Sequence, residues 1–121
     1  SYPFSIDADD GLYIVRLEPL FEALVQAVKL GRSKSEISAT FHITVAQMVL
    51  QMCQLVHKKR GLDTVALSGG CFQNRQLLHL VVDMLSAQGF NVLLHHQVPC
   101  NDGGLSLGQA MVARFSEEVN T

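Results

Sequence analysis

Two short segments of the sequence combine glycines with polar side chains that could hold an anion, a nucleotide or a metal ion. They are residues 68–74, with the sequence SGGCFQN, and residues 99–104, with the sequence PCNDGG. Glycines leave room for a ligand beside the backbone because they have no Cβ, and N–H groups at a helix start attract anions. The segments therefore favour an anion or nucleotide site, although a Gly-Gly pair is also common in plain strand-to-helix turns.

Asp102 is the candidate metal ligand of the second segment. A carboxylate beside two glycines can be approached by a hard cation and by a phosphate bound to that cation. An Asp in front of a helix equally serves as the cap of the helix N-terminus. His95 and His96 could add a nitrogen ligand, but at most one of them serves, because adjacent strand residues point to opposite faces. The alternative is that both histidines form a solvated strand end.

Cysteines and further histidines give weaker signals. Cys71 and Cys100 lie in the two segments, where a thiol nucleophile or a metal ligand is conceivable. No paired base supports such a role, so we interpret them as small loop residues and Cys53, in an apolar helical stretch, as core. The other histidines, none of which pairs with a histidine four residues away, are interpreted as rim or packing residues: His42, His57 and His79.

A βαβ unit is the element that would bring the two segments together. Residues 64–67 form an apolar run typical of a strand buried on both faces, and residues 90–94 form a second such run. Between them, residues 77–85 repeat apolar side chains at helical spacing. The two strands of such a unit are parallel, so their carboxyl ends lie at the same edge of the sheet. Each of the two segments follows one of these ends. We expect them to face one crevice, where ligands bind in open α/β sheets.

The first part of the chain predicts a hairpin and a helix. Strands over residues 4–7 and 12–17 flank a turn that contains Asp10-Gly11, a strong hairpin signal. Pro19 suits the first turn of the helix that follows, and Gly31 is placed to end it. We expect the apolar face of this helix, between those residues, to pack on another element.

Two more helices complete the prediction. Ser33 and Glu36 form a capping box for a helix that runs to residue 60. Its β-branched residues 43–45 indicate a kink or a break into two helices. Asp102 can cap a last helix, whose apolar positions are Leu105, Leu107, Met111, Val112 and Phe115.

Composition limits the class of protein. The 121 residues are 48% hydrophobic and 17% charged with a net charge of −2, which predicts a single domain over residues 1–121 with a sizeable core. Three cysteines without a CxxC pair favour a reducing, cytoplasmic setting. The near-neutral charge argues against nucleic-acid binding, and apolar stretches broken by polar residues argue against a membrane span. Residues 4–7 alternate like a strand, with no Met before them, so we expect a piece cut from a longer chain.

The two loops in their order resemble the end of the hydrogenase-maturation carbamoyltransferase HypF family. The similarity is nearly continuous between residues 64 and 110, through VALSGGCFQNRQLL and GFNVLLHHQVPCNDGGLSLGQA. The segment ISATFHITVA before it is also similar. The resemblance implies an α/β fold: one lobe, the second, of an actin-like ATPase domain of ribonuclease H-like fold, related to the tRNA threonylcarbamoyl transferase TsaD.

The family resemblance also implies an activity and a site. An upstream module makes carbamoyl-adenylate from ATP and carbamoyl phosphate, and this domain passes the carbamoyl group to the C-terminal cysteine of HypE, where it becomes cyanide for a NiFe centre. Ser68, Gly69 and Gly70 would line the adenylate, and Asn74 would hydrogen-bond its nucleoside part. Asp102 would ligate a divalent metal ion, zinc or iron.

The sequence departs from the complete family pattern. It lacks the His-x-x-x-His segment of the first lobe and all upstream modules, so we expect the chain alone to be inactive. Cys71 stands where an apolar residue such as Val is expected. Three alternatives remain: another TsaD-like carbamoyl or threonylcarbamoyl transferase, a non-catalytic nucleotide-binding lobe, and an interaction module that docks a partner through residues 33–60.

Overall fold

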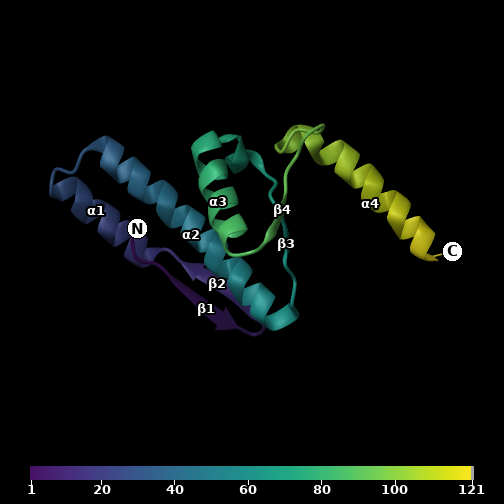
Figure 1. Ribbon diagram of the computed structural model, residues 1–121, viewed down its shortest axis with the longest axis horizontal. Coiled ribbons are helices and arrows are strands. Elements are labelled where there is room, and N and C mark those ends of the chain that lie inside the picture. The colour runs from purple at the N-terminus through teal and green to yellow at the C-terminus, as the bar shows by residue number, and fades with distance from the viewer. Residues whose placement is uncertain (121) are drawn as a thin grey trace.

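The fold is α/β, with an antiparallel hairpin, a parallel strand pair and α-helices around them (Figure 1). The computed structural model describes the backbone of residues 1–120 and the side chains of residues 1–116. In chain order the elements are β1 (Ser5–Asp9), β2 (Leu12–Arg16), α1 (Glu18–Lys29), α2 (Lys34–Arg60), β3 (Thr64–Ala66), the 3₁₀ turn η1 (Gly70–Gln73), α3 (Arg75–Ala87), β4 (Asn91–Leu93), the 3₁₀ turn η2 (Asp102–Gly104) and α4 (Leu105–Asn120).

The predicted hairpin is confirmed. β1 and β2 pair antiparallel around a two-residue turn, in which Asp10 has a φ of 46° and Gly11 a φ of 80°. Positive φ at both positions is the geometry of the tight hairpin turn that Asp-Gly favours. Lys59 of α2 places its ammonium group 5.7 Å from the ring centre of Tyr13, which holds the hairpin against the end of α2.

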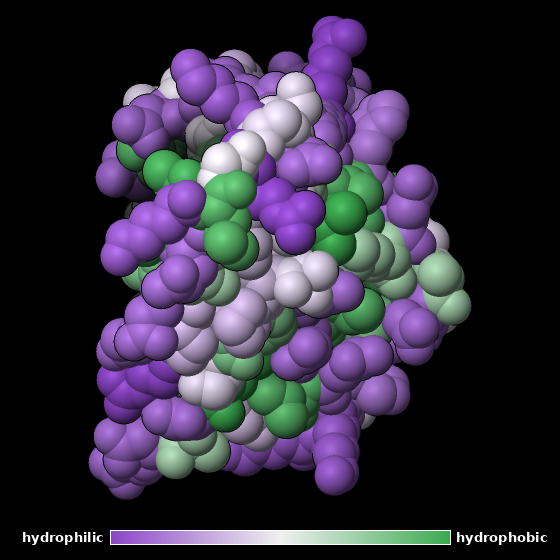
Figure 2. All heavy atoms as spheres, turned by 90° about the vertical axis from the view of Figure 1, so that its left-hand side faces the viewer, coloured by the Kyte–Doolittle hydropathy of each residue, from purple (hydrophilic) through white to green (hydrophobic). Residues whose placement is uncertain are grey.

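The apolar face of α1, which we expect to pack on another element, is covered only in part. Leu20 and Ala27 are buried, and they share a face because they lie two helical turns apart. Phe21, Val25 and Val28 are each more than half exposed. Figure 2, which looks onto this side of the molecule, shows hydrophobic atoms reaching the surface among polar ones. The helix therefore contacts the body through a narrow stripe.

α2 begins as predicted and continues without the predicted break. Ser33 Oγ accepts the Glu36 N–H at 3.2 Å, while the Glu36 carboxylate accepts the Ser33 N–H at 3.4 Å, so the capping box is present. Thr44 lies in the β-branched run and is completely buried. Its hydroxyl donates to the Thr40 carbonyl at 2.7 Å and accepts from the Tyr2 N–H at 2.8 Å. These hydrogen bonds satisfy the buried polar group inside a regular helix.

By length and composition alone α2 could cross a membrane, although the polar residues within it argue against a span. The core helix of a soluble protein meets the same criterion. Ala46, in the middle of α2, is fully buried in the hydrophobic core. Only 11% of the apolar stretch of α2 is buried within this chain, so the core accounts for part of its apolar residues.

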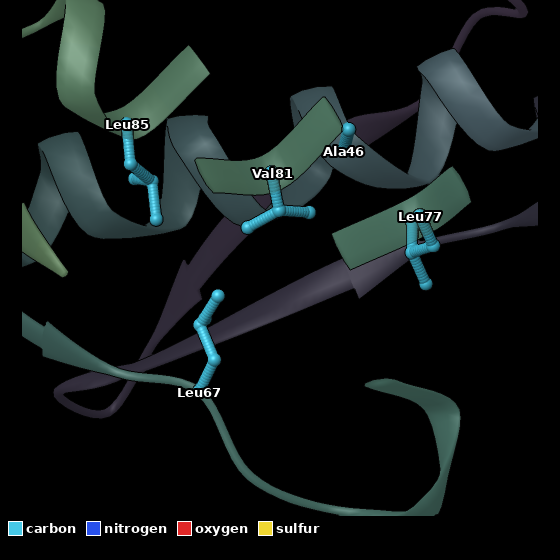
Figure 3. Close-up of a cluster of buried hydrophobic side chains, with 5 residues drawn as sticks. All are labelled: Ala46, Leu67, Leu77, Val81 and Leu85. Atoms are coloured by element: carbon cyan, nitrogen blue, oxygen red, sulfur yellow. The ribbon is translucent and has the colours of Figure 1, made fainter. Parts of the chain in front are cut away.

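The predicted βαβ unit forms the centre of the molecule. β3 and β4 pair in parallel, with Val65 opposite Val92, and α3 connects them. The core lies between this strand pair, α3 and α2 (Figure 3). It consists of buried apolar side chains from these elements: Ala46, Leu67, Leu77, Val81 and Leu85.

β3 is not buried on both faces, which corrects a second sequence prediction. Val65 is half-buried and contacts the core, but Thr64 and Ala66 are exposed. Helices α2 and α3 cover the face of the strand pair that carries Val65. None of the described residues covers the opposite face in this way. The apolar run at residues 64–67 is therefore longer than burial within this chain requires.

Replacing Leu85 with Ala should lower the free energy of unfolding by about 2–5 kcal/mol, because it leaves a cavity in a fully buried position. Leu62→Ala is the matched control: the Leu62 side chain is 57% exposed, so a change within about 0.5 kcal/mol is expected. Urea denaturation followed by circular dichroism measures both, and we expect a single transition. A gradual, non-cooperative transition in the wild type would contradict an autonomous core.

Candidate functional site

The two glycine-containing loops lie side by side, as the sequence predicts. The Gly69 N–H donates to the Cys100 carbonyl at 2.7 Å, which joins the loop after β3 to the loop after β4. The strand pairing reaches almost to this point, because the Leu67 N–H donates to the Leu93 carbonyl at 3.0 Å. Parallel pairing thus brings residues about 30 positions apart to one edge of the sheet.

A cavity of about 630 Å³ lies at this edge, between the two loops and the first turns of α4. Ser68, Gly69 and Asp102, three of the residues that the family resemblance singles out, are among its lining residues. Gly70 and Asn74 are not among its lining residues. The volume is in the range of small-molecule and cofactor sites.

His95 lies in the wall of this cavity against Ser68. Its Nε2 atom is 2.8 Å from the Ser68 Oγ atom. His96 is not among the lining residues. His95 is exposed and lies in the cavity wall, and both histidines follow the end of β4 at Leu93, so the alternation expected along a strand does not extend to them.

Asp102 does not cap a helix, which corrects the capping alternative. The cap belongs to Asn101, whose Oδ1 atom accepts the Gly103 N–H at 3.0 Å. Asp102 is the first residue of η2, and its exposed carboxylate has no hydrogen-bond partner among the described residues. The carboxylate is free to contact a ligand in the cavity.

Gly69 and Gly104 are required by the structure for different reasons. Gly69 has a φ of 103°, a conformation that other residues rarely adopt, and no atom lies within 4 Å of the position of its missing Cβ. At Gly104 a Cβ would lie 2.7 Å from the Pro99 carbonyl oxygen. The first glycine leaves space that a ligand can use, whereas the second makes room for the protein's own backbone.

Asn74 stands beside the cavity and is already engaged by the protein. Its Oδ1 atom accepts the Leu77 N–H at 3.2 Å as the cap of α3, and its Nδ2 atom donates to His42 Nε2 at 2.8 Å. His42 in turn donates from Nδ1 to the Ser38 carbonyl at 2.7 Å. A side-chain amide has two N–H groups, so one donor of Asn74 remains for a ligand.

The thiols do not form a reactive centre within the described residues. Burial raises the pKa of the Cys53 thiol, and this residue packs against the core as predicted. Cys71 is exposed and Cys100 is partly buried in the cavity wall. Across residues 1–116, no group of three or more His, Cys, Asp or Glu side chains is arranged to hold a metal ion. Asp102 can supply one ligand, and the rest of a metal site would need residues from elsewhere.

The far wall of the cavity is an exposed helix. α4 extends away from the body (Figure 1), and its predicted apolar face is uncovered by the described residues. Leu105 and Val112, which line the cavity, are 59% and 68% exposed. The predicted helix is confirmed, but its apolar face beside the cavity is left uncovered by the described residues.

Comparisons with known proteins agree with this geometry. Residues 1–109 match the family model described as "Carbamoyltransferase, Kae1-like Domain, second subdomain". A HypF homologue of Cupriavidus necator is 41% identical over 106 residues, covering 86% of this chain and 26% of the relative. HypF of Rhodobacter capsulatus is 35% identical over 102 residues, covering 84% of this chain and 13% of the relative.

A solved structure shows the same fold. The crystal structure of full-length HypF in the phosphate- and nucleotide-bound form matches with a TM-score of 0.89 and 42% identity, over 93% of this chain and 15% of that one. The chain thus spans well under a third of the length of these relatives. The fold, the two loops and the match over nearly the whole sequence lead to one conclusion: the chain belongs to the family of the second subdomain of the carbamoyltransferase Kae1-like domain.

Proposed function

We propose that this chain is the C-terminal lobe of a longer carbamoyltransferase that moves a carbamoyl group from carbamoyl-adenylate to the C-terminal cysteine of HypE. The carbamoyl group would then become the cyanide ligand of a [NiFe]-hydrogenase. The cavity between the two glycine-containing loops carries this proposal, because it offers a nucleotide-sized space at the carboxyl edge of a parallel strand pair.

The proposed reaction is an acyl transfer. The cysteine thiolate of HypE attacks the carbamoyl carbon, a C–S bond forms, and the bond from that carbon to the phosphate oxygen of AMP breaks. AMP leaves with the electron pair and carries the negative charge. The part of this chain is to bind and orient the adenylate through Ser68, Gly69 and Gly70, with the spare Asn74 N–H directed to the nucleoside.

A divalent metal ion, zinc or iron, is part of the proposal and would screen charge on the phosphate when bound. Asp102 fits as one oxygen ligand, since its carboxylate is exposed in the cavity and has no partner among the described residues. The described side chains hold no complete ligand set. The first lobe of the same protein would supply the other ligands.

The proposed context is a cytoplasmic, multidomain enzyme that uses ATP and carbamoyl phosphate. Its first lobe would cover the exposed apolar face of α4, including Leu105 and Val112, and close the cavity from the other side. Upstream modules would supply the adenylate. Burial of this apolar face would contribute to the stability of the complete domain.

Mass spectrometry of HypE tests the function. The full-length gene product is incubated with ATP, carbamoyl phosphate and HypE, and we expect a carbamoyl group on the C-terminal cysteine of HypE. HypE without that cysteine is the matched control and should remain unmodified. Transfer of a threonylcarbamoyl group to tRNA, with HypE unmodified, would instead assign the chain to a TsaD-like enzyme.

A further inference from the structure

The contact between His95 and Ser68 is a feature of the cavity that the proposed function has not yet used. The two residues follow different strands and are 27 positions apart, yet His95 Nε2 lies 2.8 Å from Ser68 Oγ. Both line the cavity together with Asp102. A hydrogen bond at this distance joins the two side chains, and the tautomer of His95 decides which of them donates.

The glycine N–H groups of the loops are largely occupied within the protein. Gly69 donates to the Cys100 carbonyl at 2.7 Å, Gly103 to Asn101 Oδ1 at 3.0 Å, and Gly104 to the Asn101 carbonyl at 3.0 Å. These amides are therefore not free to form the anion cradle that the sequence suggests. A phosphate group in the cavity can also take up donors from side chains.

Few of the side chains that line the cavity can bind an anion. No lysine or arginine is among the described residues that line it, and His95 is the lining residue that can carry a positive charge. Asp102 repels an anion unless a cation lies between them. Ser68 supplies a hydroxyl donor at the same wall as His95.

We propose that His95 is a positioning residue for the phosphate subsite, which rests on the proposed function. A phosphate oxygen without a proton can only accept, so Ser68 must donate its hydroxyl hydrogen to it. The Ser68 oxygen then accepts a hydrogen bond from His95, which must carry a hydrogen on Nε2. His95 thus aims the Ser68 hydroxyl hydrogen at the phosphate of the adenylate.

Hydrogen exchange measured by mass spectrometry on the full-length gene product tests this role. Protection of residues 67–74 and 99–105 is followed as AMP or adenosine is added. His95→Ala should weaken AMP binding about tenfold, the scale of one hydrogen bond to a charged acceptor, and leave adenosine binding unchanged. His95→Gln, which keeps an N–H donor, should recover most of the loss. His96→Ala, outside the cavity lining, is the matched control and should bind like the wild type.

A double-mutant cycle separates positioning from direct contact. In a Ser68→Ala background, adding His95→Ala should cause no further loss of AMP affinity. Unchanged AMP binding in His95→Ala, equal losses for AMP and adenosine, or losses that multiply in the double variant would each overturn the assignment. If AMP gives the wild type no protection in these segments, the proposed nucleotide site itself is rejected.

Discussion

The 121-residue chain by itself will transfer no carbamoyl group to HypE. α4, which forms one wall of its cavity, leaves its apolar face uncovered by the described residues. Its described side chains include no group of three or more His, Cys, Asp or Glu arranged to hold a metal ion, and Asp102 is the one ligand proposed from this chain. Rate acceleration depends on groups held in position around the reacting atoms, so half of a site should lose essentially all of it.

The measurement compares the isolated chain with the full-length gene product. Each is given HypE, ATP and carbamoyl phosphate, and HypE is then weighed by mass spectrometry. Circular dichroism of the isolated chain establishes that it is folded during the assay. Turnover by the folded isolated chain would contradict the assignment of the missing functions to the rest of the protein.

Replacing Asp102 with Asn in the full-length gene product should lower carbamoyl transfer at least tenfold and reduce the metal content. Even the loss of groups that only orient a metal ligand costs about 10–100-fold in affinity or activity. Asn keeps the shape of the side chain and removes the negative charge. Asp102 makes no capping hydrogen bond, so the melting temperature should hardly change.

Asp83→Asn is the matched control for this substitution. Asp83 is exposed on α3 and is not a lining residue of the cavity, so both activity and metal content should equal those of the wild type. Elemental analysis of the purified proteins measures the metal. Full metal occupancy and wild-type activity in Asp102→Asn would remove Asp102 from the site.

The sequence by itself determined the elements whose signals are local. Asp10-Gly11 predicted the hairpin turn, Ser33 and Glu36 predicted the start of α2, and apolar periodicity predicted α3 between two strands. Each of these signals acts within a few residues along the chain, because turn geometry, capping and helix periodicity are local properties of the backbone. The parallel pairing then placed both loops at one edge of the sheet.

Tertiary structure decided which predicted faces are covered. Periodicity marks an apolar face on α1, α4 and β3 but does not say whether another element lies against it. Phe21 and Val112 are exposed for this reason. At Thr44 a tertiary contact overrides a local signal. The β-branched side chain of Thr44 suggested a break in α2, but its hydroxyl accepts a hydrogen bond from the N–H of Tyr2, 42 positions away, inside a continuous helix.

The details of the site also depended on contacts distant in sequence. Asp102 was the predicted cap, but Asn101 has the extended backbone of a cap residue and its Oδ1 atom accepts the Gly103 N–H. His95 and Ser68 meet only because β3 and β4 pair in parallel register. Sequence patterns identify residues that can do chemistry, while hydrogen-bond geometry across the fold decides which of them remain free to do it.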